Sequence, residues 1–134
     1  MPVDFTPFSE RAAHYAVALA RQHDATLTML HVIERWPTKG QSDHEHVTQE
    51  IRDKLEGLIG HEATGLRCSF RIEVGQVVEK VLYTAGAVEA DLVVMGVRPR
   101  IGLLNPVMWP HAYQIVSEAA CPVLTVRGEV AQRA

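Results

Sequence analysis

Hydrophobic and polar positions follow two different periods along this chain. Five short runs have the apolar, β-branched character of strands, at residues 2–5, 26–33, 66–74, 92–95 and 123–126. Between them, apolar residues recur at the i, i+3, i+4, i+7 spacing of helices, over residues 6–23, 42–60, 78–85 and 110–119. This alternation predicts the order β-α-β-α-β-α-β-α-β, which is typical of a parallel sheet covered by helices.

Capping residues support these boundaries. Thr6 and Pro7 give the first helix a hydroxyl cap and a proline in its first turn, where the missing N–H is harmless. Pro122 is expected to end the last helix before the final strand, since proline disfavours a helical residue before it. The run 92–95 is apolar throughout, which predicts a strand buried on both faces of the sheet.

Composition sets broad limits. With 134 residues, 47% hydrophobic and 22% charged, the chain predicts a single compact domain over residues 1–134. A formal charge of −3 gives no general attraction to nucleic acid or to an anionic membrane, so neither partner is expected. The sequence has neither a run of about 20 apolar residues nor a basic, then apolar, signal segment at residue 1, so we predict a cytoplasmic protein.

Catalytic and metal-binding patterns are weak. Residues 43–46 include two histidines and two acids, but on a helix His44 and His46 lie about 200° apart and cannot share one ion. His14 and His23 lack the partnership with serine or cysteine that a nucleophilic site requires. The sequence therefore predicts no catalytic residues and no metal.

Four motifs, in order along nearly the whole chain, carry a family resemblance. They are Val3-Asp4-Phe5-Thr6 with Ser9-Glu10-Arg11-Ala12, Leu30-His31-Val32, Ala90-Asp91-Leu92-Val93-Val94-Met95-Gly96, and Cys121-Pro122-Val123-Leu124-Thr125-Val126-Arg127. Together they resemble the universal stress protein family. The resemblance implies a five-stranded parallel sheet with helices on both faces, of the flavodoxin-like, Rossmann-like type shared with adenine nucleotide alpha hydrolases. It also implies a homodimer joined through the last strand, Val123 to Arg127.

ATP-binding members of this family carry the motif G-x2-G-x9-G-[S/T] after the fourth strand. Here Gly96 matches its first position, whereas Pro99, Trp109 and Pro110 occupy the other three. Proline has no N–H to offer a phosphate and cannot adopt the positive φ that glycine allows, and tryptophan fills space that the motif leaves empty. The resemblance therefore implies a stress-response protein without a cofactor, not an enzyme, that acts through contacts with an unidentified protein partner. An ATP-binding member with an altered phosphate loop is the alternative, and weak ATP hydrolysis is left open.

A residual nucleotide or anion site is expected where the strands end. Its candidate residues are Asp4, Val32, Gly96, Arg98 and Arg100. Asp4 matches the family aspartate near the nucleotide, although a carboxylate that caps the following turn is an equal interpretation. Val32 is expected in the core either way. His111 could join the two arginines around an anion, with a solvated basic loop as the alternative.

The first strand is unusually short. Residues 2–5 provide about four positions for what the resemblance makes a central strand, and each buried backbone group left unpaired would cost about 1–3 kcal/mol. We therefore expect a truncated first strand. A piece of a longer chain, such as the second half of a tandem protein, is one explanation, and a short form completed by its dimer partner is the other.

Overall fold

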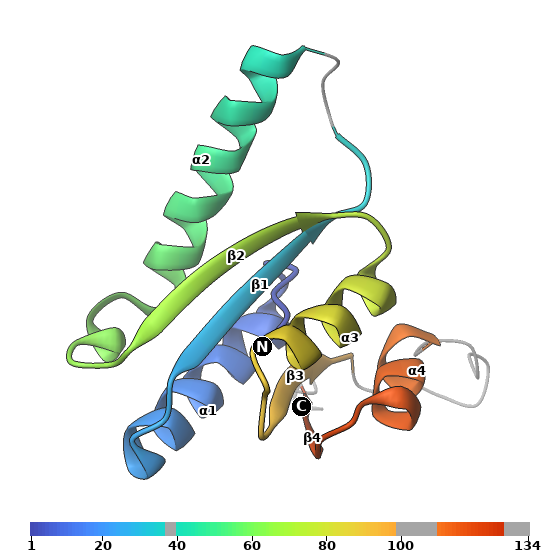
Figure 1. Cartoon of the computed structure of the whole chain (residues 1–134). Coiled ribbons are helices and arrows are strands. Elements are labelled where there is room, and N and C mark those ends of the chain that lie inside the picture. Colours follow the sequence, from blue (N-terminus) through green and yellow to red (C-terminus); the bar gives the residue numbers. More distant parts are fainter. Residues whose placement is uncertain (37–39, 99–109, 128–134) are drawn as a thin grey trace, which may run out of the picture.

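The computed structural model describes residues 1–36, 40–98 and 110–127 (Figure 1). Its helices are α1 (Pro7–His23), α2 (Gln41–Ile59), the 3-10 turn η1 (Gly60–Ala63), α3 (Val77–Ala87) and α4 (Pro110–Glu118). Its strands are β1 (Leu27–Ile33), β2 (Cys68–Val74), β3 (Val93–Val97) and β4 (Val123–Arg127). Each predicted helix is present, as are the last four predicted strands, so the alternation read from the sequence is confirmed for these elements.

The ends of α1 follow the predicted capping chemistry. Thr6 is the N-cap and its hydroxyl accepts a hydrogen bond from Ser9 N at 3.4 Å, while Pro7 occupies the first helical position. Asp24 ends the helix in the left-handed conformation, and its N–H donates to Ala20 O. These local interactions set where α1 starts and stops. The amino end of the helix lies beside Gly96, near the carboxyl end of β3.

The strands form two separate sheets rather than one. β1 pairs in parallel with β2, from Leu27 opposite Cys68 to Ile33 opposite Val74. β3 pairs in parallel with β4, from Val93 opposite Val123 to Val97 opposite Arg127. The prediction of one five-stranded sheet is therefore wrong for the described residues, which form two sheets of two strands each.

The reason lies at the first strand. Residues 1–3 run beside β1, where Val3 N donates to Leu30 O at 2.8 Å and Leu30 N donates to Met1 O at 2.9 Å. This contact amounts to a single parallel bridge between Pro2 and Leu30. Too few residues are extended here to form a ladder on both sides, and no described bridge joins them to β3. The expected truncated strand is thus reduced to one bridge, and the two sheets stay separate.

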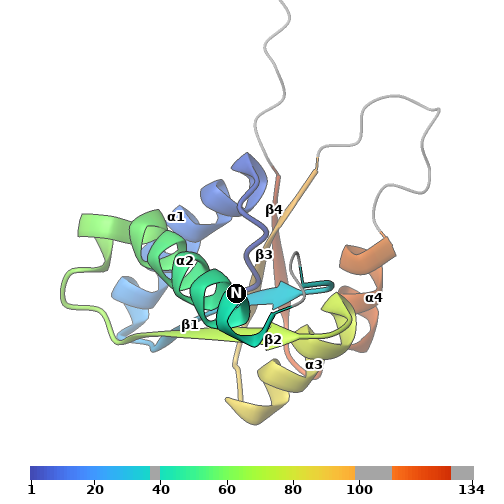
Figure 2. The ribbon, with the colours of Figure 1, turned by 90° about the horizontal axis from the view of Figure 1, so that it is seen from above.

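Helices cover both faces, as predicted. Helices α1 and α2 lie on one side of the strands, and α3 and α4 lie on the other (Figure 2). Successive residues of β1 serve the two sides, because Met29 packs with α1 and α2 while Leu30 packs with α3 and α4. In the part of the chain that the structure describes, no helix has the length and apolar character needed to cross a membrane.

Candidate functional site

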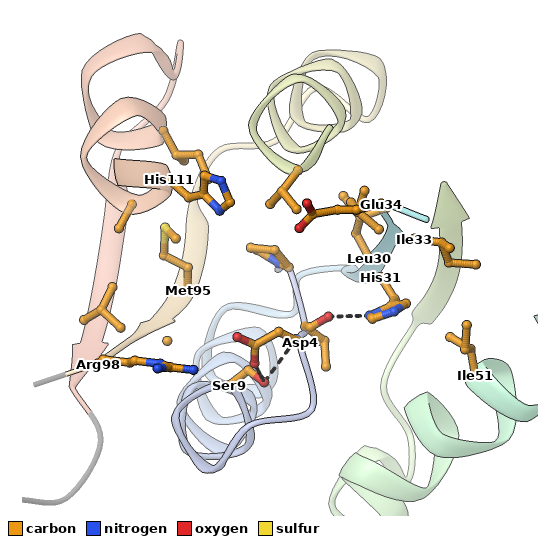
Figure 3. A pocket seen from close by; sticks show the side chains of 18 of the residues that line it. Asp4, Ser9, Leu30, His31, Ile33, Glu34, Ile51, Met95, Arg98 and His111 are labelled. Atoms are coloured by element: carbon orange, nitrogen blue, oxygen red, sulfur yellow. Dashed lines mark hydrogen bonds between the residues drawn. The ribbon is translucent and has the colours of Figure 1, made fainter. Parts of the chain in front are cut away.

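A cavity of about 650 Å³ opens where β1 and β3 end (Figure 3). Its walls come from Ile33 and Glu34 at the end of β1, Gly96 and Arg98 at the end of β3, and the first turns of α1, α3 and α4. Parallel α/β sheets hold ligands at this edge, and the volume lies in the range of small-molecule sites. The cavity is therefore the candidate site.

The structure brings together four of the five predicted site residues. Asp4, Val32, Gly96 and Arg98 all line the cavity. Arg100 lies outside the described residues, so its placement stays a prediction. Val32 also packs against the core cluster on the α3 and α4 side, in agreement with the expectation that it serves the core.

Among the other residues that line the cavity, His31, Glu34 and His111 carry side chains that can bind a polar ligand. His111, considered with the arginines, lines it from the first turn of α4. His31, part of the Leu30-His31-Val32 motif, and Glu34, which the sequence did not single out, line it from the end of β1. The signal for Glu34 was its position directly after a buried strand, since residues that follow parallel strands gather at one edge of the sheet.

Asp4 is held in the turn that leads into α1. Its Oδ1 accepts hydrogen bonds from Thr6 N at 3.0 Å, Thr6 Oγ1 at 2.5 Å and Ser9 Oγ at 2.8 Å. Ser9 is buried, with 3% of its surface exposed, so the carboxylate satisfies a hydroxyl that has little access to water. Asp4 was interpreted either as a nucleotide ligand or as a cap of the following turn, and the structure shows the cap directly. Its Oδ1 is engaged in these three hydrogen bonds.

Opposing effects set the charge of Asp4. Burial alone would raise the pKa of its carboxyl group, but the hydrogen bonds from Thr6 and Ser9 and the charge of Arg98 together outweigh burial. The pKa therefore lies below its ordinary value of 3.8. Asp4 is ionised at neutral pH and adds negative charge to the cavity wall.

Gly96 has a packing role that the motif comparison did not reveal. A Cβ atom at this position would lie 2.3 Å from Phe8 O, 2.4 Å from Phe8 C and 2.7 Å from Ser9 N. The first turn of α1 thus rests directly on β3, and only glycine leaves room for it. The glycine that matches the nucleotide motif is required here by helix–strand contact.

Charged groups of both signs surround the cavity. In Figure 3 the Glu34 carboxylate and the His111 ring point into the open space from opposite walls, and Arg98 extends toward Asp4 and Ser9. His31 Nδ1 donates to Val3 O at 2.7 Å, which leaves Nε2 without the proton when the ring is neutral. Such a site can hold a small polar ligand by hydrogen bonds and compensating charge.

Ser9 and the histidines of residues 43–46 are engaged in contacts other than those of a catalytic or metal site. Ser9, the buried hydroxyl beside the cavity, donates to Asp4 rather than to a histidine. In the segment that raised the question of a metal, the His44 ring stacks on Trp36 at 3.9 Å between centroids, and His46 pairs with Glu50 at 3.1 Å. Among the residues placed by the structure, no three His, Cys, Asp or Glu side chains gather as a metal site would require.

Fold and cavity together define the class: an α/β protein with parallel strands whose carboxyl ends border a ligand-sized site. Residues 1–127 match the model of the universal stress protein family, and the chain belongs to that family. A relative from Thermus aquaticus, the universal stress protein in QAH/OAS sulfhydrylase 3'region, is 31% identical over 92% of this chain and 93% of its own length.

Two solved structures share the fold. Hypothetical protein MJ0577 has a TM-score of 0.76 at 23% identity, with 97% of this chain and 94% of that chain covered. The universal stress protein from Archaeoglobus fulgidus in complex with dAMP has a TM-score of 0.67 at 19% identity, with 93% of each chain covered. At these identities the likeness concerns the fold alone, and it supports a Rossmann-like α/β architecture.

Proposed function

We propose that this protein is a universal stress protein domain of the type that does not bind ATP. It is a cytoplasmic regulatory protein, not an enzyme, and it acts through contacts with other proteins. One observation carries this proposal: three of the four ATP-motif positions hold Pro99, Trp109 and Pro110. The groups that would hold a triphosphate are therefore replaced by residues without the needed donors or space.

The structure supports this reading at two points. Helix α4 begins at Pro110, so the residue that opens the helix has no N–H for an anion, at the position where such helices usually donate one. Gly96, the one motif position that is kept, is needed for the contact with Phe8 and Ser9. Its presence is explained without a phosphate.

A nucleotide-binding protein with an altered phosphate grip is the second candidate. The cavity of about 650 Å³ favours it, and so does the related fold that binds dAMP, a ligand with a single phosphate. In this case Asp4 and Val32 would contact the nucleoside, and Gly96, Arg98 and Arg100 would face the phosphate. Weak ATP hydrolysis belongs with this second candidate.

Isothermal titration with ATP and Mg²⁺ separates the two. We expect no binding heat at millimolar ATP, because the loop offers too few donors for three phosphates. A parallel titration with dAMP tests the second candidate. Micromolar ATP affinity would overturn the proposal, whereas dAMP binding without ATP binding would favour the altered phosphate grip. The variant Arg98→Ala shows whether any bound nucleotide is held by its phosphate. Loss of this exposed cation should weaken binding of a ligand whose phosphate faces Arg98 and leave other binding modes unchanged.

The proposal includes a homodimer joined through β4. Among the described residues, this strand lies at the edge of a two-stranded sheet, and one row of its backbone N–H and C=O groups is available to a second copy. Leu124 is 38% exposed on this strand, which adds apolar surface to the edge. We expect sedimentation analysis to show a dimer at tens of micromolar and Leu124→Lys to shift it toward monomer. A strictly monomeric protein at that concentration would count against this interface.

A further inference from the structure

The outer edge of β2 carries unpaired backbone groups. Among the described residues, β1 is the only strand that pairs with β2 (Figure 1). Gly75 N donates to Ile33 O at the end of this ladder, so the odd-numbered residues of the segment direct their peptide groups toward β1. In a parallel ladder, the residues between them face the other side. The N–H and C=O groups of Phe70, Ile72 and Val74 are therefore open to a further strand.

The two faces of β2 differ in chemistry. Phe70 and Ile72 pack against the core cluster formed with α1 and α2, so their side chains lie on that face. Arg71 and Glu73 lie on the opposite face, because side chains alternate along a strand. There the Arg71 guanidinium donates to Glu73 Oε1 at 3.2 Å, and the two side chains are 32% and 26% exposed. Like charges on an edge strand repel a second copy, whereas unlike charges two positions apart can attract one.

Hydrogen bonding and charge together select one antiparallel register between two copies of this edge. A two-fold axis must place outward-facing residues opposite one another, since these carry the open N–H and C=O groups. With Ile72 opposite Ile72 of the second copy, Arg71 of each copy lies opposite Glu73 of the other. The neighbouring registers, displaced by two residues, place Arg71 opposite Arg71 or Glu73 opposite Glu73. Like charges directly opposite are destabilising, so the register centred on Ile72 is favoured.

The same register also matches the apolar face. Phe70 of each copy lies opposite Val74 of the other, and the Val74 side chain is 43% exposed in the single chain. Pairs of an aromatic and a β-branched residue across two strands are favourable. The charged pairs fall at positions without hydrogen bonds between the opposite residues, where side chains of the two strands come closest. One register thus satisfies the backbone, the charges and the exposed valine.

We propose that β2 is a self-association edge, through which two copies of this chain pair antiparallel over residues 70–74. The contact joins the sheets of the two copies into one, with Arg71 and Glu73 paired between copies. This surface is distinct from β4 and from the cavity at the strand ends. The proposal therefore holds whichever candidate function is correct and whether or not the dimer through β4 forms.

The test uses the full chain carrying Leu124→Lys, which opposes pairing through β4. So short an interface gives weak association, and sedimentation equilibrium at concentrations up to about 0.5 mM should show a monomer–dimer equilibrium. The amides of Phe70, Ile72 and Val74 should exchange with solvent more slowly as the protein concentration rises, because strand pairing covers them.

Charge exchange identifies the register. In the same background, Arg71→Glu and Glu73→Arg each bring like charges opposite one another, and each should weaken self-association about tenfold. A one-to-one mixture of these two variants should associate as strongly as the parent protein, since every opposite pair is again of unlike charge. Glu118→Arg changes the net charge as Glu73→Arg does, at an exposed position on α4, and should leave association unchanged.

Three results would overturn the proposal. The first is a protein that stays monomeric at the highest concentration. The second is association that leaves exchange of the Phe70, Ile72 and Val74 amides unchanged, which would place the contact elsewhere. The third is a mixture of the two charge variants that associates no better than either variant alone, because a self-complementary edge requires the mixture to recover.

Discussion

Replacing Gly96 with alanine is expected to destabilise the fold by about 3 kcal/mol, at the upper end of the usual cost of overpacking. The added Cβ would lie 2.3 Å from Phe8 O, well inside contact distance, and the atoms it meets belong to backbone. Relief requires α1 to move away from β3, which would disturb the core around Val94. Urea denaturation followed by circular dichroism would measure the change.

Gly57→Ala is the matched control for that substitution. Gly57 lies within α2, is exposed, and has open space where a Cβ would be added. Alanine there should stabilise the protein by about 0.5–1 kcal/mol, because glycine is a poor helix former. A loss of less than about 1 kcal/mol in Gly96→Ala would contradict the direct contact between α1 and β3.

Asp4→Ala is expected to cost about 2 kcal/mol at neutral pH, because hydrogen bonds to a charged group each contribute about 1.5–3 kcal/mol and solvent exposure reduces the gain. The change removes the acceptor of Thr6 N, Thr6 Oγ1 and Ser9 Oγ at the start of α1. Ser9 would keep only its longer contact, 3.3 Å, to Thr6 O. Chemical denaturation at pH 7 measures the difference from the wild type.

The same substitution gives a defined pH dependence. The pKa of Asp4 is lower in the folded than in the unfolded chain, so its ionised form contributes stability above the ordinary value of 3.8. That contribution is lost as the pH falls through the lower, folded-state pKa. The gap in stability between wild type and Asp4→Ala should therefore be constant near neutral pH and shrink below about pH 4.

Asp4→Asn separates charge from geometry. An asparagine oxygen can still accept from Thr6 and Ser9, but it carries no charge and does not titrate. This variant should lose less stability than Asp4→Ala at pH 7. Its free energy of unfolding should also lack the decrease at acidic pH that protonation of Asp4 causes in the wild type. If both variants matched the wild type at pH 7, the carboxylate would have no role in holding the turn.

Two residues that match the family's nucleotide site also have structural roles in this protein. Gly96 and Asp4 are the positions that most resemble a nucleotide site, and both residues make structural contacts with the first turn of α1. Binding measurements on variants of either residue would be confounded by altered stability. Arg98, which is exposed and lines the same cavity, is the cleaner probe of ligand binding.

The sequence by itself determined the order and limits of most elements. Thr6 and Pro7 marked the start of α1, and the apolar run before Gly96 marked β3, because capping and periodicity depend on residues close together in the chain. It also indicated Asp4, Val32, Gly96 and Arg98 as neighbours, since residues at the carboxyl ends of parallel strands meet at one edge.

Only the tertiary structure decided how the strands are joined. Whether a short strand forms one ladder, two ladders or a single bridge depends on backbone partners far away in the sequence. In the described part of the chain, residues 1–3 are bridged to Leu30 alone. The close packing of Gly96 against Phe8, where an added Cβ would lie 2.3 Å from Phe8 O, is likewise a contact between separate elements. The cavity at the carboxyl ends of β1 and β3 also depends on residues from several elements. Local patterns specify elements, whereas the space and the unpaired groups between elements exist only once the chain has packed.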